Sequence, residues 1–208
     1  KQTQTKRIVS HVRDSGQEAV LFSFPRYETP LGKAILRHLK REIGVAEAFK
    51  RADDRLGFSR LALEDAMVFQ SMMVTDKYDA APDIEAALAR GAVVVADRWW
   101  QAAYAYGASD GLLPEWLMRA HQRLPQADLN IFLDLSPEEA RRRRPQLRDR
   151  YETDRDKQRV VREHYRSLWK LSAAVEGASR WVIVDGDASP EDVERSIWTL
   201  FRPLWLKG

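Results

Sequence analysis

Helical patterns alternate with short apolar runs along this chain. Ile8, Val9 and Val12 share one face of a helical pattern that extends from Gln2 to Asp14. Short runs rich in β-branched and aromatic residues are predicted to be buried strands. These runs cover residues 19–24, 92–96, 130–135 and 181–184. Because such strands alternate with helices, the pattern predicts an α/β fold, a parallel β-sheet flanked by helices on both faces.

Helix starts are marked at three places. Thr29 followed by Pro30 is an N-cap and first-turn pair, which predicts a helix that continues to about Arg41. The sequence Ser-Pro-Glu-Glu at 136–139 is a capping box with proline in the first turn. The sequence Ser-Pro-Glu-Asp at 189–192 repeats this start signal.

The middle of the chain contains further helical patterns. One is predicted from Leu61 to Met73, and another helix should end at Gly91. Residues 44–59 are mixed in character and should include a loop. Because neither an internal repeat nor a low-complexity linker interrupts residues 1–208, we expect a single domain.

Composition narrows the class of protein. Hydrophobic residues make up 44% and charged residues 31% of the 208 residues, which excludes a disordered chain. The net charge of +3 suits a protein that handles phosphates but is too small to indicate nucleic-acid binding. The absence of cysteine excludes disulfides and thiolate metal sites. With no apolar run near the roughly 18 residues of a membrane span and no visible signal peptide, we expect a cytoplasmic protein.

Charged residues follow two of the predicted strands. Open parallel sheets bind ligands beyond the carboxyl ends of their strands. Asp97 follows the run at 92–96 and is well placed to hold Mg²⁺. Arg98 can form a bidentate pair with a phosphate, and Arg26 follows the run at 19–24 in the same way. The alternatives are a structural Asp97–Arg98 pair and a solvent-facing Arg26.

An arginine-rich segment at 141–153 follows the capping box. A mobile lid that carries arginines suits phosphoryl transfer, because the transition state spreads negative charge over the equatorial oxygens. The alternative is a patch that binds nucleic acid. The four histidines show neither metal-ligand nor catalytic-triad spacing, so we assign them to the surface or to structure.

These segments, in this order, resemble the thymidylate kinase family over nearly the whole chain. The matching segments are Lys1-Gln2-Thr3-Gln4, Phe24-Pro25-Arg26 with Thr29-Pro30-Leu31-Gly32, Asp97-Arg98-Trp99 with Ala105-Tyr106, Arg150-Tyr151-Glu152, and Val184-Asp185-Gly186-Asp187-Ala188. The resemblance implies the fold of the P-loop nucleoside monophosphate kinases, ATP and Mg²⁺ as cofactors, small-molecule nucleotide substrates and a homodimer. It also implies a strand and a glycine-rich turn, about a dozen residues in all, upstream of Lys1.

The resemblance further implies a role for each site residue. Lys1 would contact the β- and γ-phosphates of the donor, with Gln2 and Thr3 beside it. Asp97 would position Mg²⁺, with Thr3 as a second candidate ligand. Three arginines of the lid are candidates for the transferred phosphoryl group, namely Arg143, Arg148 and Arg150. On the adenine side of the donor the implied residues are Asp187 and Ala188.

The remaining implied residues would bind the acceptor monophosphate. Arg98 would bind its phosphate, and Arg26 belongs to the same acceptor-side segment. The residues that would surround the nucleoside are Phe24, Met73, Lys77, Tyr106 and Tyr151.

Four departures from the family pattern leave the kinase class intact and affect base specificity. Gln2 stands where the phosphate loop has a hydroxyl residue, and Tyr27 stands where an arginine is commoner. Met73 replaces a phenylalanine that stacks on thymine, and Lys77 replaces an arginine that reads the base. Serine and glutamine of many bacterial members are replaced by Ala102 and Gly107.

The sequence therefore predicts transfer of the γ-phosphoryl group of ATP to a pyrimidine deoxynucleoside monophosphate, which by the resemblance is dTMP and gives dTDP. One alternative is a non-catalytic or regulatory nucleotide-binding protein, motivated by Gln2 and by the lack of a glycine loop before Lys1. A second alternative is a nucleic-acid-binding module that uses the arginines at 141–150.

Overall fold

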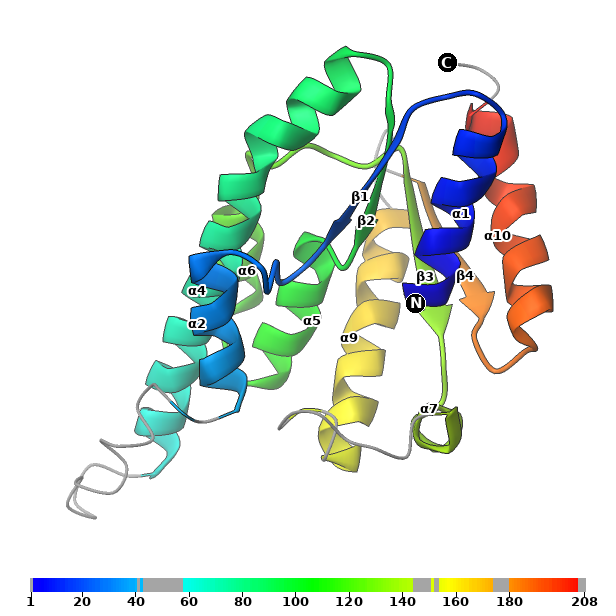
Figure 1. The fold of residues 1–208 in the computed structure, drawn as a ribbon. Coiled ribbons are helices and arrows are strands. Elements are labelled where there is room, and N and C mark those ends of the chain that lie inside the picture. Colours follow the sequence, from blue (N-terminus) through cyan, green and yellow to red (C-terminus); the bar gives the residue numbers. More distant parts are fainter. Residues whose placement is uncertain are drawn as a thin grey trace.

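The computed structural model describes residues 2–40, 42, 58–143, 151, 154–173 and 180–205. The strands are β1 (Ala19–Ser23), β2 (Val93–Asp97), β3 (Leu129–Asp134) and β4 (Arg180–Asp185). The helices are α1 (Gln2–Asp14), α2 (Pro30–Leu39), α4 (Phe58–Ala89), α5 (Trp100–Ser109), α6 (Pro114–Ala120), α7 (Pro137–Arg143), α9 (Arg155–Ala173) and α10 (Pro190–Trp205). Figure 1 shows the strands in the middle of the molecule with helices around them.

The four strands form two parallel pairs, β1 with β2 and β3 with β4. The last residues of β1 and β2, Ser23 and Asp97, are register partners. The last residues of β3 and β4, Asp134 and Asp185, are partners in the same way. All four strands point in one direction (Figure 1), so their carboxyl ends lie at one end of the molecule.

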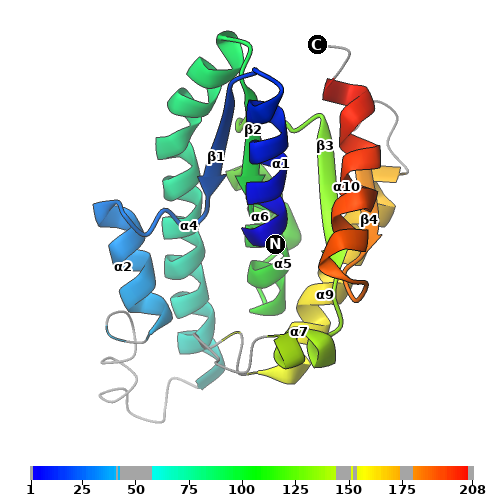
Figure 2. The same cartoon turned by 45° about the vertical axis from the view of Figure 1, so that its right-hand side comes forward.

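Helices cover both faces of the strands (Figure 2). On one face α1 packs against β1 and β2, and α10 packs against β4 and α1. On the other face α4 contacts β2, α9 contacts β4, and α5 lies between α4 and α9. The apolar stripe predicted for α1 is buried, since Val9 and Val12 pack with Ala19. The predicted α/β fold, with parallel strands and helices on both faces, is confirmed.

The predicted helix from Gln2 to Asp14 and the four predicted strands are present, the strands with shifts of one residue at their ends. The prediction of two helices between Leu61 and Gly91 was wrong, because α4 continues through Pro82. A proline inside a helix costs about 3 kcal/mol. Ala81 and Ile84, on either side of Pro82, are buried in an apolar cluster that offsets this cost.

The N-cap predicted at Thr29 fixes the loop that follows β1. The Thr29 hydroxyl accepts a hydrogen bond from the Gly32 N–H at 2.9 Å and donates one to the Arg26 carbonyl oxygen at 2.9 Å. A Cβ atom on Gly32 would lie 1.8 Å from that same carbonyl oxygen. Only glycine therefore allows α2 to pack this closely against the loop.

Some predictions fall outside the described part of the chain. These are the predicted loop at 44–59 for most of its length, the lid residues Arg148 and Arg150, and Lys1. None of the helices that the structure describes combines the length and the apolar character needed to cross a membrane.

Candidate active site

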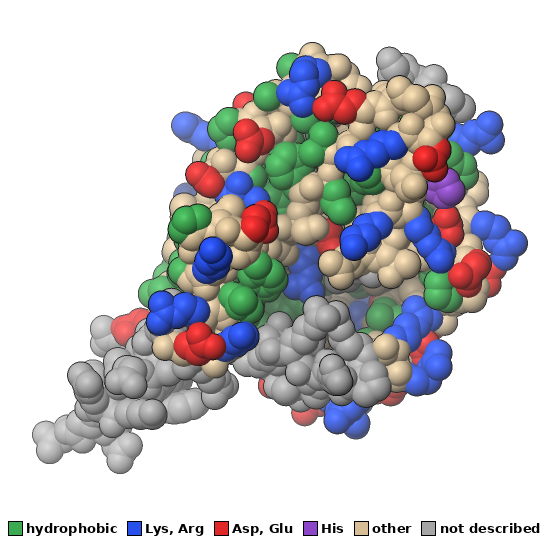
Figure 3. All heavy atoms as spheres, viewed as in Figure 1, with side chains coloured by type: hydrophobic (Ala, Val, Ile, Leu, Met, Phe, Trp, Pro, Cys, Tyr) green, Lys and Arg blue, Asp and Glu red, His purple; other side chains and the backbone are tan. Residues whose placement is uncertain are grey.

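A cavity of about 860 Å³ lies beyond the carboxyl ends of the strands, as the rule for parallel sheets predicts. Its walls include Ser23, Asp97, Leu135 and Gly186, each of which ends or follows a different strand. Figure 3 shows a hollow near the middle of this face, with lysine or arginine atoms inside it. The volume lies within the range of roughly 300–1,000 Å³ found for small-molecule sites.

The described lining of the cavity carries a marked excess of positive charge. Asp97 is its one acidic side chain, and the basic side chains are Lys40, Arg98, Arg141, Arg143, Arg155 and Arg162. A concave surface of one sign concentrates ligands of the opposite sign. The cavity is therefore suited to a polyanion such as a nucleotide.

Asp97 ends β2 and is fixed to the loop after β1 through the main chain. The Phe24 N–H donates to the Asp97 carbonyl oxygen at 3.0 Å. The Asp97 carboxylate itself makes no hydrogen bond or ion pair with the residues that the structure describes. A half-buried carboxylate of this kind, which lines a cavity together with several basic side chains, is available to a ligand.

Arg98 has a strained backbone. Its φ is 68°, in the left-handed region that residues with a Cβ rarely occupy. Arg98 lines the cavity and also a smaller adjoining pocket, and its guanidinium group has no hydrogen-bond or ion-pair partner among the described residues. Such strain is concentrated at functional sites, where the surrounding structure holds it. The position suits recognition of a phosphate.

Arg26 differs from Arg98 because its guanidinium group is already used. Its Nε atom donates to Asp76 at 2.9 Å, and a terminal nitrogen donates to Asp79 at 2.5 Å. Its main-chain N–H also donates to Asp76, at 3.1 Å. These bonds anchor the loop after β1 to α4. A direct contact between Arg26 and the acceptor stays a prediction.

The first turn of α1 contributes Gln2 and Thr3 to the cavity wall. A helix N-terminus presents unpaired main-chain N–H groups and the positive end of the helix dipole, which favours anions. The residues predicted for the donor-phosphate side therefore line the same cavity as the strand ends and Asp97. Lys1 lies outside the described residues.

The smaller pocket, lined by α4, α5 and Tyr151, contains several of the predicted acceptor-side residues. Met73, Tyr106 and Tyr151 all line it. The rings of Tyr106 and Tyr151 meet edge to face, with centroids 4.9 Å apart. The Tyr151 hydroxyl donates to Asp110 at 2.5 Å, which ties Tyr151 to the end of α5.

Phe24 and Lys77 do not line this smaller pocket. Phe24 is buried against Trp99, with ring centroids 5.1 Å apart, although it also reaches the large cavity. The Lys77 side chain is fully buried, with Nζ 5.6 Å from the centre of the Phe24 ring. Burial, opposed by the charge of Asp76 and assisted by that of Arg98, lowers the pKa of Lys77 to about 7. Direct contact of either residue with the nucleoside stays a prediction.

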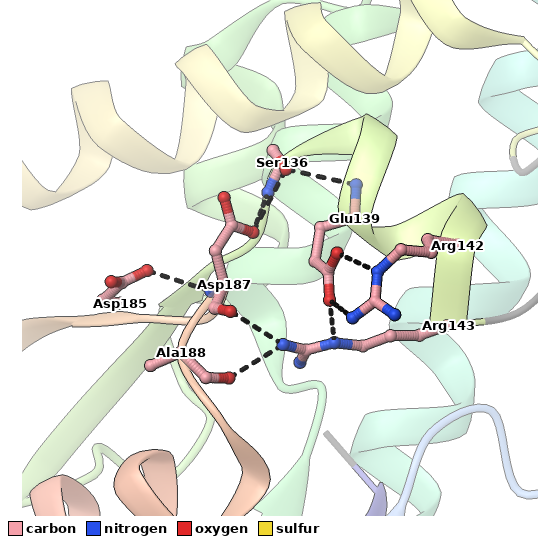
Figure 4. A network of polar contacts seen from close by, with 7 residues as sticks. All are labelled: Ser136, Glu139, Arg142, Arg143, Asp185, Asp187 and Ala188. Carbon is pink, nitrogen blue, oxygen red and sulfur yellow. Dashed lines mark hydrogen bonds and ion pairs between the residues drawn. The ribbon is translucent and has the colours of Figure 1, made fainter.

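Arg143 joins two predicted motifs on the donor side (Figure 4). One of its terminal nitrogens donates to the carbonyl oxygens of Asp187 and Ala188, at 3.0 Å and 2.8 Å. Its Nε atom donates to Glu139 at 2.6 Å. The start of the predicted lid is therefore attached to the loop after β4 that the resemblance assigns to adenine.

Half of the predicted capping box at 136–139 is formed. The Ser136 hydroxyl accepts the Glu139 N–H at 3.2 Å, as predicted. The Ser136 N–H donates to the Asp187 carboxylate at 2.9 Å and not to Glu139 (Figure 4). The Glu139 carboxylate instead holds Arg142 and Arg143, and these two arginines lower its pKa to about 2.

Sequence reasoning missed the contribution of α9 to the cavity. Arg155 and Arg162 both line it, and their spacing of seven residues, which places them on one helix face, was the available signal. Arg162 donates to Asp134 at 2.5 Å, and Arg166 donates to the same carboxylate at 2.7 Å. These two arginines lower the pKa of Asp134 against the effect of its burial. The end of β3 is thereby fixed to α9.

Within the described part of the chain, few protein groups are available to Mg²⁺. The described residues contain no cluster of three or more His, Cys, Asp or Glu that could hold a metal ion. Asp97 and Thr3 both line the cavity, and neither side chain has a hydrogen-bond partner in the described part of the chain. This fits Mg²⁺, which proteins bind through one or two carboxylates while water and substrate phosphates supply the other oxygens.

Comparison with known proteins assigns this site to a family. The family model described as thymidylate kinase matches residues 1–197. The chain belongs to the thymidylate kinase family. It is 24% identical over 213 residues to the thymidylate kinase of Caenorhabditis elegans, with 98% of this chain and 85% of that protein covered. It is 26% identical over 201 residues to the human thymidylate kinase, with 96% and 83% covered.

An archaeal relative gives a similar result. The chain is 29% identical over 206 residues to the probable thymidylate kinase of Pyrococcus horikoshii, with 97% of this chain and 90% of that protein covered. Membership of the thymidylate kinase family confirms the resemblance found in the sequence. It favours neither the non-catalytic nucleotide-binding protein nor the nucleic-acid-binding module.

Proposed function

We propose that this protein transfers the γ-phosphoryl group of ATP to dTMP, giving dTDP and ADP. The observation that carries the proposal is the cavity at the strand ends, whose described lining combines six basic side chains with a single carboxylate, that of Asp97. Two nucleotides bring several negative charges to one place, and a cavity of this charge offsets their repulsion. The thymidylate kinase relatives and the match to their family model support dTMP as the acceptor.

Phosphoryl transfer needs positioning and positive charge more than covalent help from the protein. In this proposal Arg98 binds the acceptor phosphate, because Arg98 lines the cavity and its guanidinium group has no hydrogen-bond or ion-pair partner among the described residues. Arg143, together with Arg148 and Arg150 of the lid, stabilises the charge of the transferred group. Arg26 holds the acceptor-side loop through its ion pairs with Asp76 and Asp79. By the family resemblance, Arg26 is also proposed to contact the acceptor.

The donor would lie across the first turn of α1. Lys1, Gln2 and Thr3 are proposed to contact its phosphates, and Asp187 and Ala188 its adenine. When bound, Mg²⁺ would neutralise part of the phosphate charge, with Asp97 and Thr3 as the protein groups that hold it. Phe24, Met73, Lys77, Tyr106 and Tyr151 are proposed to surround the acceptor nucleoside.

A coupled ADP-release assay tests the proposal. The full-length protein is supplied with ATP, Mg²⁺ and each of dTMP, dUMP, dCMP and dAMP in turn. We expect the highest kcat/KM for dTMP. If no monophosphate is turned over while ATP still binds, the non-catalytic alternative replaces the proposal. A band shift with DNA or RNA at low salt, without any turnover, would favour the nucleic-acid-binding module instead.

Three further expectations remain predictions. A homodimer is expected from the family resemblance, and light scattering at the concentration of the assay would measure it. Folding of residues 1–208 as a single domain predicts one cooperative thermal transition. The cytoplasmic location is an expectation from the sequence alone.

A further inference from the structure

The small pocket on the acceptor side contains a polar group that the proposed mechanism leaves without a use. Gln70 lies on α4 and lines this pocket, with only 1% of its surface exposed. Neither its amide nitrogen nor its amide oxygen has a hydrogen-bond partner in the described structure. Buried amides are almost always paired, because an unpaired buried donor or acceptor is costly. An amide left unpaired at the wall of a pocket is explained when a ligand pairs with it.

Gln70 is the one carboxamide among the described residues that line this pocket. On α5 the pocket is lined by Ala102 and Ala103, whose side chains offer no hydrogen bonds, and by Tyr106. A Cβ atom on Gly107 would lie 3.3 Å from Cγ of Gln70 and 2.7 Å from a methyl carbon of Leu117. Glycine at 107 therefore lets α5 approach closely enough to hold the Gln70 side chain against the pocket.

Gln70 belongs to a buried row on α4. Gln70, Met73 and Lys77 follow the spacing i, i+3 and i+7, so they share one helix face, and all three are buried. Lys77 is directed along the helix, where Nζ donates to the Met73 carbonyl oxygen at 2.9 Å. Lys77 does not line the pocket, whereas Gln70 and Met73 do. The amide of Gln70 is thus better placed than the ammonium group of Lys77 to meet a base in the pocket.

We propose that Gln70 reads the edge of the pyrimidine base, an inference that rests on the proposed kinase function. A carboxamide presents one donor and one acceptor side by side. Thymine presents the matching pair, since N3–H donates and O4 accepts. In this arrangement Oε1 of Gln70 accepts from N3–H, Nε2 donates to O4, and Met73 covers a face of the ring. Base recognition then comes from Gln70 on α4. On α5, Ala102 and Gly107 stand where the family resemblance leads one to expect polar residues.

The pocket is small, about 40 Å³. Entry of a base therefore requires its lining to move. Met73 suits such a movement, because its unbranched thioether side chain has three rotatable bonds and adapts to irregular spaces. Gln70 lies beside Gly107 and already lines the pocket, so in this proposal α4 itself does not need to move.

The test combines one protein change with one substrate change. Gln70→Leu removes the amide, and methylation of N3 of dTMP removes the donor that the amide would bind. With the wild-type protein we expect kcat/KM for N3-methyl-dTMP to be about 10- to 100-fold lower than for dTMP. With Q70L we expect kcat/KM for dTMP to fall by a similar factor. The loss of kcat/KM on N3-methylation should then shrink to within about threefold, because the effects of removing two groups that interact with each other are not additive. The KM for ATP should stay unchanged.

A matched control separates base reading from folding. Gln101 is a second buried glutamine, whose amide donates to Asn130 at 2.7 Å and does not line the pocket. We expect Gln101→Leu to lower the thermal midpoint but to keep the wild-type ratio of dTMP to N3-methyl-dTMP. Q70L should unfold at the same temperature as the wild type or higher, because it removes an unpaired buried amide.

Two outcomes keep this inference distinct from the proposed function. If Q70L retains the full wild-type penalty for N3-methylation, the assignment of Gln70 is overturned while the kinase function stands. If the wild-type protein turns over no monophosphate, the proposed function fails. In that case calorimetry measures the Kd of dTMP and of N3-methyl-dTMP for the wild type and for Q70L. If the ratio of the two Kd values is the same in both proteins, the assignment of Gln70 is again overturned.

Discussion

The buried ammonium group of Lys77 donates a hydrogen bond to the main-chain carbonyl oxygen of Met73, one turn earlier in α4 and 2.9 Å away. Lys77 has no exposed surface, and burial is the main cause that lowers its pKa to about 7 from an ordinary value of 10.5. A lysine with a lowered pKa in the folded protein is a source of pH-dependent stability.

The free energy of unfolding should rise between about pH 7 and pH 10 because of Lys77. In this window the unfolded chain binds a proton that the folded chain does not, so raising the pH favours folding, by up to about 1.4 kcal/mol per pH unit. Urea unfolding of the wild type and of Lys77→Met at pH 7, 8 and 9 measures the effect. K77M should be the more stable near pH 7 and should lose this slope.

The exposed lysine Lys33 on α2 provides the control for this experiment. Lys33→Met should leave the slope of the wild type unchanged. Parallel profiles for the wild type and K77M would contradict the assignment of the slope to Lys77.

Replacement of Asp76 by alanine should lower the free energy of unfolding by about 3–5 kcal/mol, because it leaves the buried Arg26 side chain without its main partner. Asp76 is fully buried and accepts two hydrogen bonds from Arg26. Asp79 contacts the same guanidinium group, but 65% of its side chain is exposed. Asp79→Ala should cost less than about 1 kcal/mol. Equal losses in the two variants, measured by urea unfolding, would show that burial does not set the strength of these pairs.

Asp97→Asn should reduce kcat by about 100-fold or more, because an amide does not balance the charge of a magnesium ion. The carboxylate has no partner among the described residues, so the thermal midpoint should stay within a few degrees of that of the wild type. Titration of Mg²⁺ at saturating ATP provides the check. A variant with wild-type kcat and wild-type dependence on Mg²⁺ would remove Asp97 from the metal site.

Arg143→Ala should raise the KM for ATP by about tenfold, because Arg143 holds the loop at Asp187 and Ala188. Arg142 is the matched control, since it donates to the same glutamate, Glu139, without reaching that loop. Arg142→Ala should change the KM for ATP by no more than about twofold. If the two variants give equal KM values for ATP, the contact with the loop has no part in donor binding.

The sequence was sufficient to predict the strands and the end of the molecule at which the large cavity lies. Short apolar runs are readily recognised as strands when a carboxylate such as Asp97 or Asp185 follows them, because the polar residue marks where the strand ends. The same reasoning failed at Pro82, since the apolar neighbours Ala81 and Ile84 keep the helix intact by burial, and this burial depends on residues distant in sequence.

Side-chain pairing could not be predicted in the same way. Arg26 and Arg98 look alike in the sequence, since each follows a strand. The structure distinguishes them. Arg26 forms ion pairs with Asp76 and Asp79 on α4, whereas no described residue pairs with Arg98. Gln70 carried no signal in the sequence at all. The proposed role of Gln70 depends on its buried amide having no hydrogen-bond partner among the described residues, and this is visible only when the neighbouring helices are in place.

The left-handed backbone at Arg98 has a consequence for attempts to engineer this protein. Glycine adopts a φ of 68° without the penalty of about 1–2 kcal/mol that a Cβ atom incurs there. Arg98→Gly should therefore raise the thermal midpoint while it abolishes turnover of dTMP. Selection of variants for heat resistance alone would enrich this inactive change, so such libraries must be screened for phosphoryl transfer at the same time.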